Sequence, residues 1–251
     1  MRLTELTEYL DRYLSTPTIP DYPNALNGLQ VASRRTDIRR VAAAVDVCAA
    51  TIGMAAEAGA DLLLVHHGLF WTGPRPLVGP QFDRVAGLLA ADLALYSAHL
   101  PLDLHAEVGN NPVLARQLGV AIKGGFGDLH GSTIGVWGEL DEPRDAFLAR
   151  VGKLLNVTPR SLAFGPSRIR RLGIVTGAGG SLIGAAAALG LDTLLTGEGV
   201  HHSYFDAEEL KVNVIYAGHY ATETAGVRAL ADHLASRFGL TTVFLDHPTG
   251  M

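Results

Sequence analysis

Short apolar runs alternate with alanine-rich segments along the chain, and three of these runs end in histidine. LLLVHHG (62–68) ends in the pair His66 and His67, while LYSAHLPLD (95–103) and IYAGHYATE (215–223) each lead to a histidine that is followed four positions later by a carboxylate. Apolar runs of this length, bounded by polar or glycine residues, predict buried strands. The pattern therefore predicts an α/β protein whose strands deliver polar side chains at their ends.

An internal repeat organises this pattern. Residues 39–68 align with residues 170–199 at an offset of 131, and eleven of the thirty aligned pairs are identical. Each copy reads as a strand, a turn of small residues, an alanine-rich helix, a glycine and a second apolar strand, which predicts a βαβ unit. A further helix and a third strand follow in each copy, and the histidine and carboxylate come after that strand at an offset of 120. We expect an α/β fold of two similar lobes related by pseudo-two-fold symmetry.

The repeat suggests a boundary near the middle of the chain. We assign residues 1–125 to the first lobe and 126–251 to the second, and we read 126–166 as a bridging βαβ segment without ligand-type clusters. An amphipathic helix is expected at the start of the chain, in MRLTELTEYLDRYL, and a final helix at about 222–237.

Composition and charge narrow the class of protein. Of the 251 residues, 48% are hydrophobic and only 18% are charged, which excludes a disordered chain. A net charge of −5 argues against a nucleic-acid partner. The single cysteine, Cys48, cannot form an internal disulfide, the first residues do not resemble a secretion signal, and no apolar run approaches the roughly 18 residues of a membrane span. We expect a cytoplasmic protein.

The polar residues at the strand ends are of the types that bind metal. Imidazole and carboxylate groups are common ligands of zinc, iron and manganese, and ligands of open α/β sheets bind beyond the carboxyl ends of the strands. The candidates are His66, His67, Asp103, His219 and Glu223. Adjacent side chains at a strand end point to opposite sides, so the two neighbouring histidines could address two ions separately.

Each candidate also has an ordinary structural interpretation. His66 and His67 could be a buried pair at a strand end, His219 and Glu223 the polar start of a helix, and Asp103 a turn or cap residue. The duplicated spacing favours the metal interpretation. A glycine-rich stretch, TGAGG (176–180), suggests a phosphate loop but lacks the Lys-Ser/Thr ending of one.

The remaining histidines receive weaker assignments. His99 could ligate a metal or hold a ligand in place, and with Glu198 and His202 it is a candidate for general acid or base catalysis. We expect His201 and His202 at the rim of a pocket or in contact with substrate. Four further histidines have no partner at ligand spacing and are expected at the surface: His105, His130, His233 and His247.

These motifs together resemble a known family. In order and spacing, the chain is similar to the Nif3-like dinuclear metal-centre family, also called GTP cyclohydrolase I type 2 homologues, nearly from end to end. The motifs are NGLQV (27–31), VHHG (65–68), YSAHLPLD (96–103) with GNN (109–111), TGEGVHH (196–202) and GHYATE (218–223). Many members have Thr-Asn where this chain has Leu100 and Pro101, and the chain lacks room for the extra domain that some members insert.

The resemblance implies a duplicated α/β fold, a toroidal homohexamer built as a trimer of dimers, and two divalent metal ions per subunit, which could be zinc, iron or manganese. It implies that His66 and Asp103 hold one ion, that His67 and His219 hold the other, and that Glu223 bridges them.

Two functional hypotheses follow. Two neighbouring cations can activate water and polarise the group under attack, which favours a metal-dependent hydrolase of a small molecule, with GTP ring opening as the reaction that the family name suggests. The alternative is a non-catalytic metal-binding or regulatory hexamer. The two hypotheses are distinguished by measuring the metal content of the purified protein and its turnover, alongside that of the His67→Ala and Glu223→Ala variants.

Overall fold

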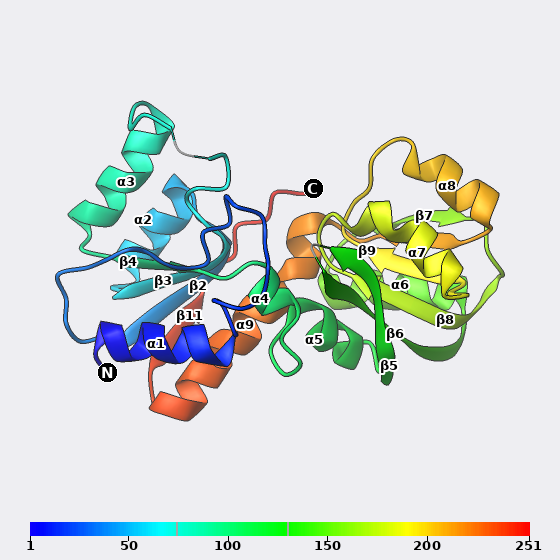
Figure 1. Ribbon diagram of the computed structural model, residues 1–251, viewed down its shortest axis with the longest axis horizontal. Coiled ribbons are helices and arrows are strands. Elements are labelled where there is room, and N and C mark those ends of the chain that lie inside the picture. Colours follow the sequence, from blue (N-terminus) through cyan, green and yellow to red (C-terminus); the bar gives the residue numbers. More distant parts are fainter. Residues whose placement is uncertain (74, 130) are drawn as a thin grey trace. The chain divides into compact units, whose positions relative to one another are not determined.

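The computed structural model describes residues 1–73, 75–129 and 131–251, and it divides into two compact units (Figure 1). The first unit contains residues 1–109 and 226–247, and the second contains residues 110–225 and 248–251. Within the described ranges, no helix combines the length and the apolar composition that crossing a bilayer requires.

The first unit is built on a five-stranded sheet in the order β1-β4-β3-β2-β11. Strands β4, β3, β2 and β11 run parallel to one another, and β1 is antiparallel to β4. Helices α2 and α3 cover one face of this sheet, and α1 and the later part of α9 cover the other (Figure 1). The elements of this unit are α1 (Leu3–Tyr13), β1 (Gly28–Val31), β2 (Arg40–Asp46), α2 (Ala49–Glu57), β3 (Leu62–His67), α3 (Pro80–Ala90), β4 (Ala94–Ser97), α4 (Leu100–Asp103), the later part of α9 (His219–Phe238) and β11 (Thr241–Phe244).

The second unit is built on a six-stranded sheet in the order β5-β6-β8-β9-β10-β7. One buried cluster joins the sheet to α5 and α6, and another joins it to α7 and α8, so helices cover both of its faces. The elements of this unit are α5 (Asn110–Gln117), β5 (Ile122–Leu129), β6 (Ser132–Pro143), α6 (Arg144–Leu155), β7 (Arg160–Ala163), β8 (Arg168–Val175), a 3-10 turn (Gly179–Leu182), α7 (Ile183–Ala188), β9 (Thr193–Thr196), α8 (Ser203–Leu210), β10 (Asn213–Tyr216) and the first turns of α9.

Burial on both faces explains the continuous apolar runs of the central strands. In β3 the residues Leu62, Leu63, Leu64 and Val65 are all inaccessible to solvent. Parallel strands covered by helices on both sides need apolar side chains at every position, and polar groups are then confined to the strand ends. His66 and His67 are at such an end.

The internal repeat is confirmed at the level of individual hydrogen bonds. Asp61 accepts from the backbone N–H groups of Arg39 and Arg40 at 2.8 and 2.9 Å, and its repeat partner Asp192 accepts from those of residues 170 and 171 at the same distances. The glycines that terminate the two helices are also equivalent, since Gly59 and Gly190 have φ values of 65° and 70° directly after the helix C-caps. The same residues therefore build the same βαβ unit twice.

Several predicted elements are confirmed. The first helix spans Leu3–Tyr13, and the final helix begins at His219, three residues before the predicted start. The predicted bridging segment supplies β6, α6 and β7, all in the second unit. The second compact unit contains residues 110–125 and the first contains residues 226–247, whereas the predicted boundary near residue 125 assigns these segments the other way round. The predicted boundary stays a prediction.

Candidate metal centre

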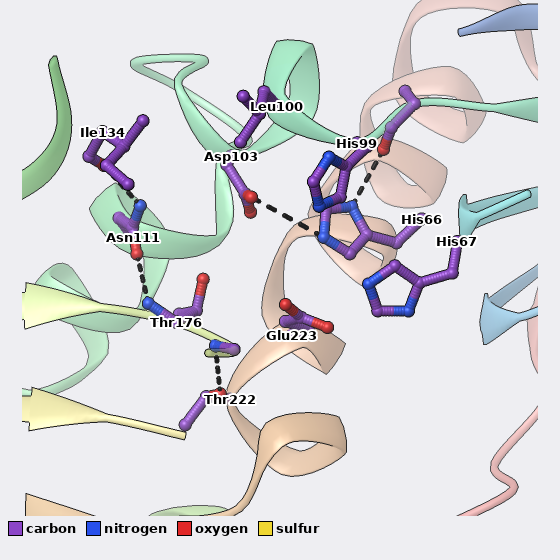
Figure 2. Close-up of polar contacts among 12 residues, drawn as sticks. His66, His67, His99, Leu100, Asp103, Asn111, Ile134, Thr176, Thr222 and Glu223 are labelled. Atoms are coloured by element: carbon purple, nitrogen blue, oxygen red, sulfur yellow. Dashed lines mark hydrogen bonds and ion pairs between the residues drawn. The ribbon is translucent and has the colours of Figure 1, made fainter. Parts of the chain in front are cut away.

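In the first unit, β3 and α4 bring the first pair of predicted ligands together (Figure 2). His66 lies at the end of β3 and Asp103 in the single turn of α4, and both are buried. The Nε2 atom of His66 is 3.7 Å from Oδ2 of Asp103, while its Nδ1 atom is hydrogen-bonded to the Ala98 carbonyl at 2.9 Å. One ring nitrogen is thus held by the backbone, and the other faces a carboxylate.

His67 is held in the same way by a neighbouring strand. Its Nδ1 atom is 2.9 Å from Oδ1 of Asp46, the last residue of β2. The parallel register of β2 and β3 places Asp46 directly opposite His67, so the contact follows from the strand pairing. A carboxylate at Nδ1 stabilises the tautomer that leaves the Nε2 lone pair available to a cation.

His99 belongs to the same histidine cluster. One ring nitrogen from each of His66, His67 and His99 lies within 4.8 Å of the others. The Nδ1 atom of His99 is 2.9 Å from Oδ1 of the buried Asp21. Burial would raise the pKa of Asp21, but the hydrogen bond and charge of His99, together with hydrogen bonds from Asn27 and the Leu100 amide, lower it. Asp21 is therefore an ionised acceptor that orients His99.

The NGLQV motif fixes the loops that carry these histidines. Asn27 accepts from the His99 amide at 2.7 Å and donates to Asp21 at 2.8 Å. Gln30 accepts from the Leu69 amide at 2.7 Å, just after the end of β3. The motif therefore positions the cluster through the backbone on both sides of it.

The second unit holds His219 and Glu223 on the first turns of α9. The Nδ1 atom of His219 is 2.8 Å from Oε1 of Glu198, and its Nε2 atom is 3.1 Å from Oε2 of Glu223. Burial would lower the pKa of His219, but the hydrogen bonds and charges of Glu223 and Glu198 outweigh it and raise the pKa to about 9. Two carboxylates around one imidazole create a local negative charge that favours a cation.

A glycine leaves the space that Glu223 occupies. A Cβ atom built on Gly177, which has a φ of 65°, would collide with the Glu223 carboxylate and would lie 3.3 Å from Nε2 of His219. The Gly177 amide donates to Thr222 at 3.0 Å, and the neighbouring Thr176 amide donates to the buried Asn111 at 2.7 Å (Figure 2). The backbone of this turn is thus held against the start of α9.

The donor chemistry fits divalent cations. All four histidines hold Nδ1 against an oxygen acceptor: a carbonyl for His66, and carboxylates for His67, His99 and His219. This arrangement is characteristic of metal-binding histidines, because the acceptor fixes the ring orientation and raises the basicity of the other nitrogen. The carboxylates of Asp103 and Glu223 face His66 and His219, respectively. Each unit therefore provides nitrogen and oxygen ligands of the types that zinc, iron and manganese accept.

The other predicted residues have varied surroundings. Glu198 is in contact with His219 and also lines a pocket together with His201, whereas His202 is exposed at the N-cap of α8. His247 is exposed as predicted, and His130 lies outside the described residues.

The surface prediction for His105 and His233 is wrong. Both are half-buried, and each packs against the ring of Tyr13 with a centroid distance of 4.2 Å. Isolated histidines carry no sequence signal that would reveal such stacking.

Two residues of the centre were missed in the sequence. Asp46 ends an apolar strand, which is the signal used for the histidines, but its role depends on which strand lies beside β3. Asp21 lies in a loop without periodicity, 78 residues before His99, and no pattern in the sequence pairs them.

Comparison with known proteins gives one family across the whole chain. The family model described as Duf34/NIF3 (NGG1p interacting factor 3) matches residues 1–249.

Individual relatives agree with this match. A protein of Deinococcus radiodurans named GTP cyclohydrolase 1 type 2 homolog is 48% identical, with 98% of this chain and 94% of the relative covered. Among solved structures, the structural-genomics protein ybgI, described as of unknown function, is 34% identical with a TM-score of 0.93. Protein TTHA1606 of Thermus thermophilus is 42% identical with a TM-score of 0.91, and both structures cover 100% of each chain.

Proposed function

Because this chain belongs to the Duf34/NIF3 family, we propose that it is a metal-dependent hydrolase of a small molecule, with two divalent ions per subunit. His66 and Asp103 are the proposed ligands of one ion, His67 and His219 those of the other, and Glu223 the bridging ligand. Zinc, iron and manganese all suit these donors. Bound in this way, the ions would supply an activated water and polarise the group under attack.

The observation that carries the proposal is the shared environment of the histidines. Each of His66, His67 and His219 has its Nδ1 atom fixed by an oxygen acceptor, so that Nε2 is the ring atom that would bind an ion. A buried histidine that served only to fill the core would not require the same nitrogen to be engaged each time.

The residues around the ligands have roles of their own. Asp46 and Glu198 orient His67 and His219, and Asp21 orients His99. We propose that His99 exchanges a proton at Nε2 with the substrate or leaving group, since the Asp21 carboxylate at Nδ1 holds the ring in one orientation. Glu198 and His202 remain the other candidates for this role.

Metal content tests the ligand set directly. Purified protein loaded with zinc, iron or manganese is expected to retain two ions per chain by mass spectrometry of the metals. His67→Ala and Glu223→Ala are expected to lower this number, and His247→Ala, at an exposed histidine, is expected to leave it unchanged. Two ions retained in both ligand variants would contradict the assignment.

Turnover tests the hydrolase. GTP is the first substrate to test, because relatives are named GTP cyclohydrolase 1 type 2 homolog, followed by other nucleotides, phosphoesters and cyclic amides. We expect turnover that depends on metal and is lost in both ligand variants. Stoichiometric metal without turnover on any substrate would instead favour a non-catalytic metal-binding or regulatory protein.

We further propose a cytoplasmic homohexamer arranged as a toroidal trimer of dimers, following the family resemblance. The expected mass in solution is about 159 kDa, six times the 26.5 kDa of the chain. Light scattering coupled to gel filtration measures this mass, and a monomer at micromolar concentration would contradict the proposal.

A further inference from the structure

A pocket of about 1010 Å³ lies within the second unit and borders the start of α9. Its walls come from β7, the end of β10, the loop that follows β9, and α8. This volume is at the upper end of the range for small-molecule sites, about 300–1000 Å³. The pocket is therefore large enough for a ligand of nucleotide size.

The walls of the pocket are aromatic and accessible. Tyr204 and Phe205, on α8, are 37% and 49% exposed, and Val200 is 57% exposed. The Tyr204 and Phe205 rings pack edge to face, with centroids 5.5 Å apart, and Tyr216 is fixed by a 2.7 Å hydrogen bond between its hydroxyl and that of Ser203. Accessible aromatic side chains in a concave surface provide stacking area for a planar ring.

Arg160 provides a positively charged group in the wall of the pocket. Arg160 lies directly opposite Tyr216 in the antiparallel pairing of β7 with β10, and both side chains line the pocket. In the part of the chain that the structure describes, no carboxylate forms a salt bridge with the Arg160 guanidinium, which can therefore pair with an anionic ligand group.

Glu198 connects the pocket to the candidate metal ligands. Its carboxylate lines the pocket and also holds Nδ1 of His219 at 2.8 Å through one oxygen. An ionised carboxylate has lone pairs for further donors, so the same group can accept from an N–H group of a ligand. A ring bound here would lie beside the first turn of α9.

We propose that this pocket binds a planar heteroaromatic ring that bears an N–H group and an anionic substituent. The ring packs against the aromatic side chains of Tyr204 and Phe205, Glu198 accepts from the N–H group, and Arg160 pairs with the anion. That this ligand is the substrate rests on the proposed hydrolase function, whereas its binding does not.

Fluorescence titration of the full-length protein tests the binding. The probe is 2-aminopurine riboside 5′-monophosphate, whose emission is quenched when its ring stacks. The same titration with 2-aminopurine riboside, which lacks the phosphate, measures the contribution of the anion. Ribose 5-phosphate, which lacks the ring, is tested as a competitor. We expect saturable quenching in zinc-loaded and in chelator-treated protein, tighter binding with the phosphate than without it, and weak competition by ribose 5-phosphate.

Matched variants assign the contacts. Tyr204→Ala and Phe205→Ala are expected to weaken both ring-containing probes about tenfold, the effect of losing a stacking partner. Arg160→Ala is expected to weaken only the monophosphate, by a similar factor, and Arg160→Lys is expected to restore part of the loss. Phe82→Ala and Arg34→Ala replace an exposed aromatic and an exposed arginine of the first unit and are expected to have no effect.

The outcomes separate this inference from the proposed function. Absence of saturation up to millimolar probe, or equal affinities across the pocket variants, overturns the pocket proposal even if the protein retains two metal ions. A change in sedimentation coefficient for Phe205→Ala with unchanged probe affinity also overturns it, because the aromatic wall is then an interface between copies. Ring binding without any metal-dependent turnover supports the pocket and contradicts the hydrolase.

Discussion

At the scale of single residues, the centre depends on side chains that orient the histidines. Asp46 and Glu198 engage the Nδ1 atoms of His67 and His219 at 2.9 and 2.8 Å, and the Ala98 carbonyl does so for His66. Such partners commonly change metal affinity by a factor of about 10–100 when they are replaced. The ligand set therefore extends beyond the residues that would touch a cation.

Asp46→Asn tests this orienting role. The amide cannot accept as strongly from His67 and does not stabilise the required tautomer, so zinc affinity is expected to fall about tenfold or more. Because Asp46 is 37% exposed, its contribution to folding is small, and the midpoint of urea unfolding without metal is expected to stay near that of the wild type. Asp232→Asn, at an exposed site on α9, is the control, and equal zinc affinities in the two variants would contradict the role.

The raised pKa of His219 predicts how metal affinity depends on pH. With a pKa of about 9 the ring is protonated at neutral pH in the metal-free protein, and a cation must displace this proton. Affinity is therefore expected to rise with pH, by up to about tenfold per unit below pH 9. Competition with a zinc chelator at pH 6.5, 7.5 and 8.5 measures the slope, and an affinity independent of pH would contradict it.

Sequence reasoning reached the ligand candidates but not the acceptors that orient them. His66 and His67 end an apolar run, and Asp103 and Glu223 share a duplicated spacing from a histidine, so these candidates are visible as patterns along the chain. Asp46 and Asp21 act through strand order and loop closure, which join residues 21 and 78 positions apart. Such pairings depend on the folded topology and leave no local signal.

At the scale of elements, the two copies of the repeat differ at one position with a functional consequence. Asp46 ends β2 in the first copy, and Gly177, at the offset of 131, follows β8 in the second. The first copy uses this position to hold His67, whereas the second leaves it empty and Glu223 fills the space. Identical frameworks thus provide two different sets of donors.

Gly177→Ala tests this difference. The new methyl group would collide with the Glu223 carboxylate and strain a backbone with φ of 65°, so loss of at least one of the two expected ions is predicted by metal analysis. Gly190→Ala strains a similar φ of 70°, but its Cβ would meet only the end of an arginine side chain at 4.0 Å. It is expected to lower stability by about 1 kcal/mol without loss of metal. If both variants retained the wild-type metal content, the packing role of Gly177 would be wrong.

The elements themselves were predictable to different degrees. The βαβ units were visible because their strands are apolar throughout and their helices end at glycine. Strand β5, IKGGFGDL, has three glycines and few buried positions, so its sequence resembles a loop, and pairing with β6 is what makes it a strand. Edge strands of this kind depend on tertiary context rather than on local preference.

At the scale of the whole molecule, the chain leaves the first unit at residue 109 and returns to it at 226. The returning segment supplies β11, which pairs in parallel with β2 at the edge of the first sheet. The first unit therefore contains both the beginning of the sequence and a segment close to its end.

A fragment experiment tests this dependence. Residues 1–109 alone leave β2 as an uncovered edge and lack the α9 side chains that bury one sheet face, so the fragment is expected to aggregate or remain unfolded. Joining residues 226–247 to its end through a flexible linker is expected to give a folded protein with cooperative thermal unfolding. A cooperatively folded fragment 1–109 would show that β11 is dispensable.

The late return of β11 also sets an order of events during synthesis. Residues 110–225 form a nearly continuous stretch that can complete its six-stranded sheet while translation continues, whereas the amino-terminal sheet lacks an edge strand until residue 244 has emerged. Nascent chains usually fold from the amino terminus onward. In this protein the sheet that is synthesised first is completed last. A ribosome-bound chaperone that covers the exposed edge of β2 could therefore act during most of the synthesis of the chain.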